Sequence, residues 1–155
     1  MKYDDASWHY GGEFPAGLPI ENGGTHIGMF LGWVITRDLV GELHLEESAP
    51  RVQEVKDRRI TGRDFLFFEC DGKLIDEDLN ATGNSFAMAY YESTYSADYY
   101  DNAFPEGEDP YSVEDSWANF DRLAEILDRR FSEWQQGAVF EKEQPPKRRC
   151  WQFWS

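Results

Sequence analysis

Three histidines and a few acidic residues are the side chains of this chain that could bind a metal or move a proton. His9, His26 and His44 stand apart, outside any HExxH or HxH motif and without a cysteine at zinc-ligand spacing. Asp4 and Asp5 lie close to His9 in the sequence. A carboxylate beside an imidazole can hold a metal or orient a general base. A plain Asp-His hydrogen bond that fixes an ordered coil would use the same residues.

Other catalytic and ligand-binding motifs are missing from the sequence. The run from Asp76 to Asn80 lacks the alternate acids, central glycine and terminal glutamate of a calcium-binding EF-hand loop. Gly11-Gly12 and Gly23-Gly24 neither follow a clear strand nor carry a P-loop lysine, and no GxSxG nucleophile motif occurs. We therefore expect no catalytic residue, no cofactor and no metal, and we interpret the chain as a binding protein rather than an enzyme.

The charge balance argues against whole classes of partner. The 155 residues include 30 acids and 15 bases, which gives a formal net charge of −15. Such a surface repels phosphate backbones and anionic lipid headgroups, so we expect neither nucleic-acid nor membrane binding. The longest charge-free apolar stretch, Ile27 to Val34, is also too short to span a bilayer. With 41% hydrophobic residues, the chain has enough apolar material for a packed core.

Most of the negative charge lies in one segment. Residues 69–115 contain thirteen acids and a single base, Lys73. A charge run of this kind is often only a solvated face, but it also fits the binding surface of a basic partner. Under the second interpretation, the candidate partner-binding residues are the acids and tyrosines at Asp76, Glu77, Asp78, Tyr95, Asp98, Tyr99, Tyr100, Asp101, Glu106, Glu108 and Asp109. The tyrosines would serve as desolvated anchors among the carboxylates.

The two cysteines, Cys70 and Cys150, are far apart and are typical of reduced intracellular thiols rather than of a disulfide framework. The N-terminus runs directly into Lys2 and Asp4 without a secretory pattern. We therefore expect a cytoplasmic protein.

The elements that must position these side chains are mainly helical. Glycine and proline breakers in residues 1–24 predict an ordered coil held by Trp8, Tyr10, Phe14 and Leu18. From Thr25 to Val40 the apolar residues surround the helical wheel, which predicts a buried helix. Gly28 and Gly32 share one side of it, where another backbone could approach closely.

Further helices are predicted along the rest of the chain. One begins at Pro50 and runs through Arg59, and another follows a cap formed by Thr61 and Asp64, with a stop at Asp71-Gly72. A strand is the alternative for the apolar residues 65–68. Asp76 is a candidate cap for a segment that reaches Tyr100 and is interrupted near Gly83.

The clearest periodicity places Val113, Trp117, Phe120, Ala124, Leu127, Phe131 and Trp134 on one helix face. This helix would be capped by Ser112 and Asp115 and end at Gly137.

Together these patterns predict a mainly α, single-domain bundle of about five helices. Its parts would be an ordered coil (1–24), a helical body (25–137) and an extended C-terminal tail (138–155). The tail carries the basic and aromatic sequence KRRCWQFWS. We expect it to dock on the body of its own chain, although binding to a neighbouring copy, as in an oligomeric scaffold, is an alternative.

Three stretches of the sequence, YDDASWHYGGEFP, GGTHIGMFLGWVI and DGKLIDEDLN, are similar to those of a family of short bacterial proteins of unknown function. The resemblance implies lineage but transfers no catalytic residue. In general character the chain is also similar to immunity proteins, which neutralise toxins delivered by type VI or contact-dependent systems. We therefore expect an immunity protein whose acidic, tyrosine-rich surface occludes the active site of a basic toxin. The alternative is a metal-dependent enzyme or regulator that uses Asp4, Asp5 and His9.

Overall fold

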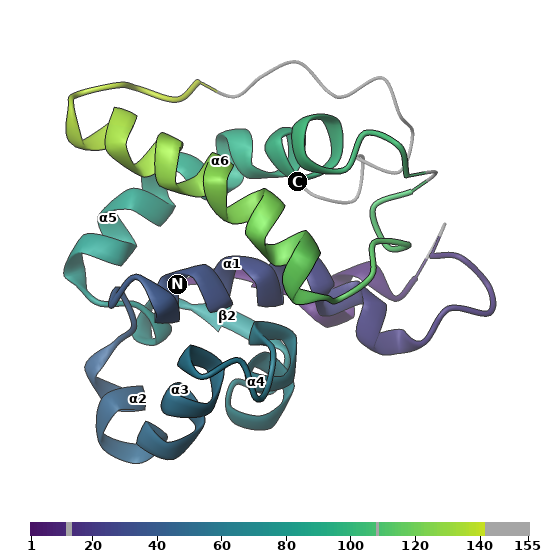
Figure 1. Cartoon of the computed structure of the whole chain (residues 1–155), viewed down its shortest axis with the longest axis horizontal. Helices are drawn as coiled ribbons and strands as arrows, with labels where there is room; N and C mark the ends of the chain where they lie inside the picture. Colours follow the sequence, from purple (N-terminus) through teal and green to yellow (C-terminus); the bar gives the residue numbers. More distant parts are fainter. Residues whose placement is uncertain (12–13, 108, 142–155) are drawn as a thin grey trace.

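Helix α1 (Thr25–Thr36) lies at the centre of the structure. The computed structural model describes residues 1–11, 14–107 and 109–141. Figure 1 shows α1 between α6 (Trp117–Gln135) and the group formed by α2 (Glu42–Glu47), α3 (Ala49–Lys56) and α4 (Gly62–Glu69). Every residue of α1 from Thr25 to Ile35 is buried, as expected for a helix that is apolar on all sides. The mainly α fold is confirmed, with α2 as a short helix that the sequence did not predict.

Helix α4 packs directly on the glycine side of α1. A Cβ atom added to Gly62 would lie 1.9 Å from the carbonyl oxygen of Gly28, and one added to Gly28 would lie 2.3 Å from the Cα atom of Arg63. The close backbone approach expected at Gly28 is therefore confirmed. The capping box of α4 is also confirmed, because Thr61 accepts from the Asp64 amide and Asp64 accepts from the Thr61 amide. The helix ends at Glu69, and the expected stop follows at Asp71 and Gly72, both with positive φ.

Two short strands join the N-terminus to the middle of the chain. β1 (Lys2–Asp5) and β2 (Lys73–Ile75) pair antiparallel, with Asp4 opposite Leu74 and Asp5 opposite Lys73. The N-terminal segment, which was expected to be a coil, thus begins with a strand. The 3-10 turns Ala6–His9 and Ile20–Gly24 lie between this strand and α1. Trp8, expected to hold the segment on the core, is 52% exposed. The pairing brings Asp4 onto the first turn of α1.

The region between β2 and α6 differs from the expected single interrupted helix. Asp76 lies in a 3-10 turn (Asp76–Asp78), and the cap of α5 (Ala81–Tyr90) is Asn80, whose side chain accepts from the Gly83 amide. Helix α5 continues through Gly83 without a break. It is followed by π-helical turns at Tyr91–Tyr95 and Asp98–Ala103.

Helix α6 covers the side of α1 away from α4. Of the expected apolar face, Phe120, Ala124 and Leu127 are buried, whereas Val113 lies before the start of the helix. Leu123, which was not part of the expected face, is buried as well. The helix is capped by Ser116 rather than by Ser112, because the Ser116 hydroxyl accepts from the Asn119 amide at 3.2 Å. Gly137, with a φ of 99°, follows its end.

Beyond α6, Phe140 is the last aromatic side chain described, and it packs against Tyr90 with ring centroids 5.4 Å apart. Residues 142–155, which include the KRRCWQFWS sequence, lie outside the described residues, so the docking of the tail stays a prediction. Among the described helices, none combines the length and the apolar composition that a membrane span needs.

Candidate functional site

Asp4, His9 and His26 converge at one buried point of the structure. The Nε2 atom of His9 lies 2.9 Å from Asp4 Oδ1, and the Nε2 atom of His26 lies 3.1 Å from Asp4 Oδ2. The exposed fractions are 5% for Asp4, 2% for His9 and 0% for His26. One carboxylate and two imidazoles that face one another form a set able to hold a transition-metal ion.

Local structure explains how each of the three reaches this point. Asp4 is buried on β1, His9 ends the 3-10 turn at Ala6–His9, and His26 is in the first turn of α1. Asp5, which the sequence analysis grouped with Asp4 and His9, has a different role. Its carboxylate caps the 3-10 turn by accepting from the Ser7 amide at 2.9 Å and pairs with Lys2 at 2.9 Å.

Two tyrosine hydroxyls form an outer layer around the cluster. Tyr91 donates to Asp4 Oδ2 at 2.7 Å, and the hydroxyl of Tyr111 lies 3.1 Å from His9 Nδ1. Such outer partners fix the ring orientation of histidine ligands in metal sites. The sequence did not predict the roles of Tyr91, Tyr111 and His26 in this cluster. Tyr91 and Tyr111 are 87 and 102 residues from their partners, and no local pattern signals contacts at such separations.

The electrostatics of the cluster keep Asp4 charged and His26 neutral. Burial by itself would raise the pKa of Asp4, but hydrogen bonds from His26 and His9 outweigh it and hold that pKa well below its usual range. Burial, followed by the charge of neighbouring His9, lowers the pKa of His26 to about 4, although Asp4 acts in the opposite direction. A charged carboxylate and a neutral imidazole are the forms in which these side chains bind metals.

A small surface pocket adjoins the cluster. It has a volume of about 200 Å³ and is lined in part by Asp4 and Tyr91 themselves. The rest of its lining includes groups that suit a polar molecule and consists of Lys2, Tyr3, Trp8, Glu92 and Ser96. The buried Asp-His cluster therefore has a polar opening to solvent beside it.

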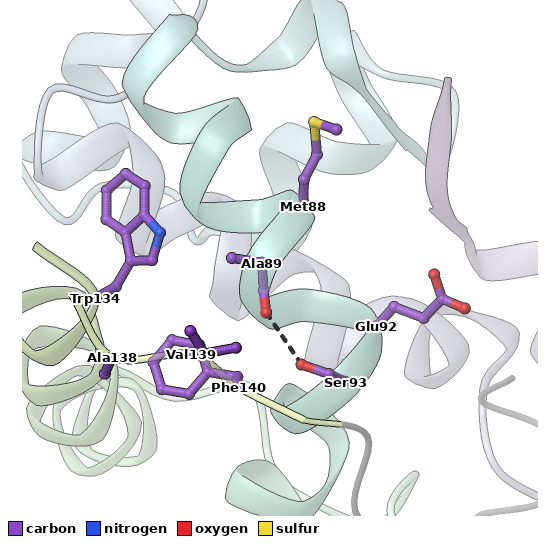
Figure 2. Close-up of a pocket in the computed structure, with 8 residues that line it drawn as sticks. All are labelled: Met88, Ala89, Glu92, Ser93, Trp134, Ala138, Val139 and Phe140. Carbon is purple, nitrogen blue, oxygen red and sulfur yellow. Dashed lines mark hydrogen bonds between the residues drawn. The ribbon is translucent and has the colours of Figure 1, made fainter.

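Another pocket, of about 380 Å³, lies between α5 with the π turn after it and the end of α6 (Figure 2). Glu92 and Ser93 line it with polar side chains, and its apolar lining consists of Met88, Ala89, Trp134, Ala138, Val139 and Phe140. The hydroxyl of Ser93 is already bonded to the Ala89 carbonyl at 3.1 Å. Since no histidine or cysteine among the described residues lines this pocket, we place the candidate site at the Asp-His cluster.

The predicted acidic and tyrosine-rich surface is not assembled as expected. Tyr95, Tyr99 and Tyr100 are each 0% exposed, so they belong to the core and cannot anchor a partner on this surface. Asp98 is also 0% exposed and is paired with Arg130, and Asp78 is 3% exposed and bonded to His44. All five residues were predicted from the sequence to lie on a partner surface, and their burial corrects that prediction.

The remaining predicted residues are closer to solvent. Asp76 pairs with the N-terminal amine at 3.2 Å, Glu106 with Arg122 at 2.9 Å, and Asp109 accepts from the Tyr111 amide at 2.8 Å. Glu77 and Asp101 are exposed, and within the described residues neither is in an ion pair. Glu108 lies outside the described residues. A binding role for the exposed carboxylates stays a prediction.

Comparison with known proteins identifies a family but no characterised relative. No curated protein and no solved structure matches the chain. A family model described as "Domain of unknown function (DUF7832)" matches residues 2–113. The match includes the whole Asp4, His9 and His26 cluster with its tyrosine partners, and it agrees with the expected resemblance to a family of unknown function. The chain belongs to the DUF7832 family.

Proposed function

We propose that this protein binds a divalent transition-metal ion, zinc in the first instance, through Asp4, His9 and His26, and that the metal holds a small polar molecule entering from the adjoining pocket. The observation that supports this function is the convergence of one carboxylate and two imidazoles from three separate elements. It develops the metal-dependent alternative of the sequence analysis, with His26 in place of Asp5.

The spacing of the donor atoms fits a metal. Zinc ligands at about 2.0–2.1 Å in a tetrahedron are about 3.3 Å from one another. Each imidazole lies close to a different oxygen of the Asp4 carboxylate, at 2.9 Å from His9 Nε2 to Oδ1 and at 3.1 Å from His26 Nε2 to Oδ2. One donor atom from each of the three residues lies within 4.8 Å of the others, so small side-chain shifts would bring all three to a shared ion. A bound cation would also neutralise the buried charge of Asp4.

The number of ligands indicates what such a metal would do. Three protein ligands leave a fourth position for water or a ligand, which distinguishes reactive zinc sites from closed structural ones. The metal would polarise an oxygen bound at that position, or lower the pKa of water bound there. Lys2, Tyr3 and Glu92 in the pocket would then orient the molecule by hydrogen bonds.

Metal binding by the full-length protein tests this proposal. Isothermal titration calorimetry measures the binding of Zn²⁺ to the Cys70→Ser protein. This background removes the sulfur of a second cluster, which is formed by His44, Cys70 and Asp78. We expect one ion per chain. In Asp4→Asn the affinity should fall by more than the ~10–100-fold that loss of an outer partner costs.

The matched control is Asp98→Asn, since Asp98 is likewise a buried carboxylate that accepts from a tyrosine, Tyr90, at 2.6 Å. This change should leave zinc affinity unaltered in the folded protein. Acetate, a minimal carboxylate ligand, should also change the absorption of the Co²⁺-loaded protein. If zinc does not bind, or binds Asp4→Asn with equal affinity, the cluster only fixes the N-terminal segment. If acetate leaves the cobalt spectrum unchanged, the metal has no open coordination position.

A second proposal concerns a basic protein partner, such as a toxin domain that the chain would neutralise as an immunity protein. It is favoured by one observation, the exposed carboxylates of Glu77, Glu92 and Asp101, which are in no ion pair within the described residues. Carboxylates of this kind act mainly on the rate of association with a basic surface. Because the predicted tyrosine anchors are buried in the core, other contacts would have to provide the binding affinity.

A further inference from the structure

A second group of side chains, His44, Cys70 and Asp78, converges away from the Asp4 cluster. The Sγ atom of Cys70 lies 3.7 Å from His44 Nε2 and 3.5 Å from Asp78 Oδ1, and these two atoms are 2.7 Å apart. The three residues come from α2, from the residue that follows α4, and from the 3-10 turn after β2. One sulfur, one nitrogen and one oxygen thus face a common point.

These distances match the edges of a zinc coordination sphere. With Zn–S near 2.3 Å and Zn–N or Zn–O near 2.0–2.1 Å, tetrahedral ligands are separated by about 3.5 Å when sulfur is one of the pair, and by about 3.3 Å otherwise. Both distances from Cys70 Sγ agree with this value to about 0.2 Å. Only the contact between His44 and Asp78 must open, by about 0.6 Å.

Surrounding contacts hold the three donors in place. The second oxygen of Asp78 accepts from the Ile75 amide at 2.8 Å, and the ring of His44 packs edge-on against Phe65 with centroids 5.0 Å apart. His44 and Asp78 are each 3% exposed, whereas Cys70 is partly exposed. The site is therefore preorganised on its inner side and reachable from the side of the thiol.

The arrangement does not suit the main alternative, a cysteine nucleophile. In a catalytic triad the nucleophile contacts one ring nitrogen and the carboxylate contacts the other, so that the imidazole can pass a proton between them. Here Cys70 and Asp78 both contact Nε2 of His44. Three donors that share one centre are the pattern of metal ligands rather than of a proton relay.

From this geometry we infer that His44, Cys70 and Asp78 form a zinc site whose fourth ligand is water. The ion ties α2, the end of α4 and the turn after β2 together, and its charge compensates the thiolate and the carboxylate. The inference is independent of the function proposed for the Asp4 cluster, because the two clusters share no residue.

Cobalt absorption of the full-length protein tests this inference, with Cys150→Ser as the background so that Cys70 is the remaining cysteine. A thiolate bound to Co²⁺ gives a sulfur-to-metal charge-transfer band in the near ultraviolet, and the Asp4 cluster contains no sulfur. We expect the band to appear with one equivalent of Co²⁺ at this site and to be displaced by Zn²⁺. It should persist in Asp4→Asn, so the failure of one site is distinguishable from the failure of the other.

Three variants then test the ligand set. Cys70→Ser should abolish the band, and His44→Gln and Asp78→Asn should each weaken cobalt binding by more than ~100-fold, beyond the loss of an outer partner. Circular dichroism checks that each variant is folded. Because His44→Gln could unfold the buried site, the reaction of Cys70 with a thiol reagent gives a second readout on the Cys150→Ser protein, where Zn²⁺ should slow it at least tenfold. The inference would be overturned if no band appears with excess Co²⁺ or if Zn²⁺ leaves the thiol reactivity unchanged. It would also be overturned if the band survives in folded His44→Gln and Asp78→Asn.

Discussion

Asp98 shows how a residue predicted to meet a partner is used within the fold. Its carboxylate accepts from Tyr90 at 2.6 Å, from Asn102 at 2.8 Å, and from Arg130 through two nitrogens at 2.8 and 2.9 Å. The bidentate contact joins the π turn at Asp98–Ala103 to α6. A buried charge with this many donors stabilises the fold only while its partners remain.

Replacing Asp98 should therefore cost much more than replacing its neighbour Asp101. Asp98→Asn removes the buried negative charge opposite Arg130. It also places an amide NH2 group against groups that donate to the carboxylate in the parent protein, so we expect the free energy of unfolding to fall by about 3 kcal/mol. Asp101→Asn, at an exposed position, should change it by less than about 0.5 kcal/mol. Urea denaturation of both variants measures the difference. Equal losses would contradict the role given to the Asp98 contacts.

At the scale of elements, the crossing of α1 and α4 depends on backbone contact rather than on interlocking side chains. Gly62 faces both Gly28 and Gly32 of α1. A methyl group has no room there, because its nearest neighbours are backbone atoms, which cannot rotate away.

Gly62→Ala should separate these helices and lower the unfolding free energy by about 3 kcal/mol or more. The control is Gly11→Ala, where an added Cβ would meet nothing within 4 Å. We expect that change to lie within about 0.5 kcal/mol of the parent protein. Thermal unfolding followed by circular dichroism compares the two. A Gly62→Ala protein as stable as Gly11→Ala would show that the helices can shift at no cost.

The elements that could be predicted from sequence are those set by nearby residues. The Thr61 and Asp64 cap, the apolar surround of α1 and the face of α6 all depend on spacings of three or four residues. The β1–β2 pairing could not be predicted, since it joins residues about seventy positions apart and leaves no local periodicity. Without that pairing, Asp4 could not be placed beside His26.

Tyr95, Tyr99 and Tyr100 were misassigned for a different reason. They are surrounded in the sequence by acids, which suggested an exposed segment. The chain there follows π turns, which hydrogen-bond from residue i to i+5 and shift which side chains face inward. As a result all three rings are buried, and Tyr95 donates to the backbone carbonyl of His26 at 2.5 Å.

At the scale of the whole molecule, the net charge of −15 is only partly available to a partner. Several acids of residues 69–115 are engaged within the chain, including Asp78, Asp98 and Glu106. Glu77, Glu92 and Asp101 are among the exposed acids of this segment that are in no ion pair with a described residue, so they could still attract a basic protein.

If these exposed acids bind a basic partner, neutralising them should affect binding more than neutralising an equal number of acids elsewhere on the surface. Replacing Glu77, Glu92 and Asp101 by Gln, Gln and Asn should slow association with a basic partner about tenfold and flatten its salt dependence. The control is a Gln triple at Glu42, Glu46 and Glu47, three exposed acids on α2, which alters the net charge equally. Surface plasmon resonance with the product of the neighbouring gene compares them. Equal effects would point to net charge alone, and no binding at all would count against the immunity role.

The β1–β2 pairing has one further consequence, which concerns thermodynamic linkage. Asp4 lies on β1, and Asp78 follows β2 after the two intervening residues of a 3-10 turn, so both candidate metal sites are attached to the same ladder of hydrogen bonds. An ion that fixes one end of this ladder also reduces the freedom of the other end. Occupancy of either site should therefore raise the metal affinity of the other, and by the same factor in both directions.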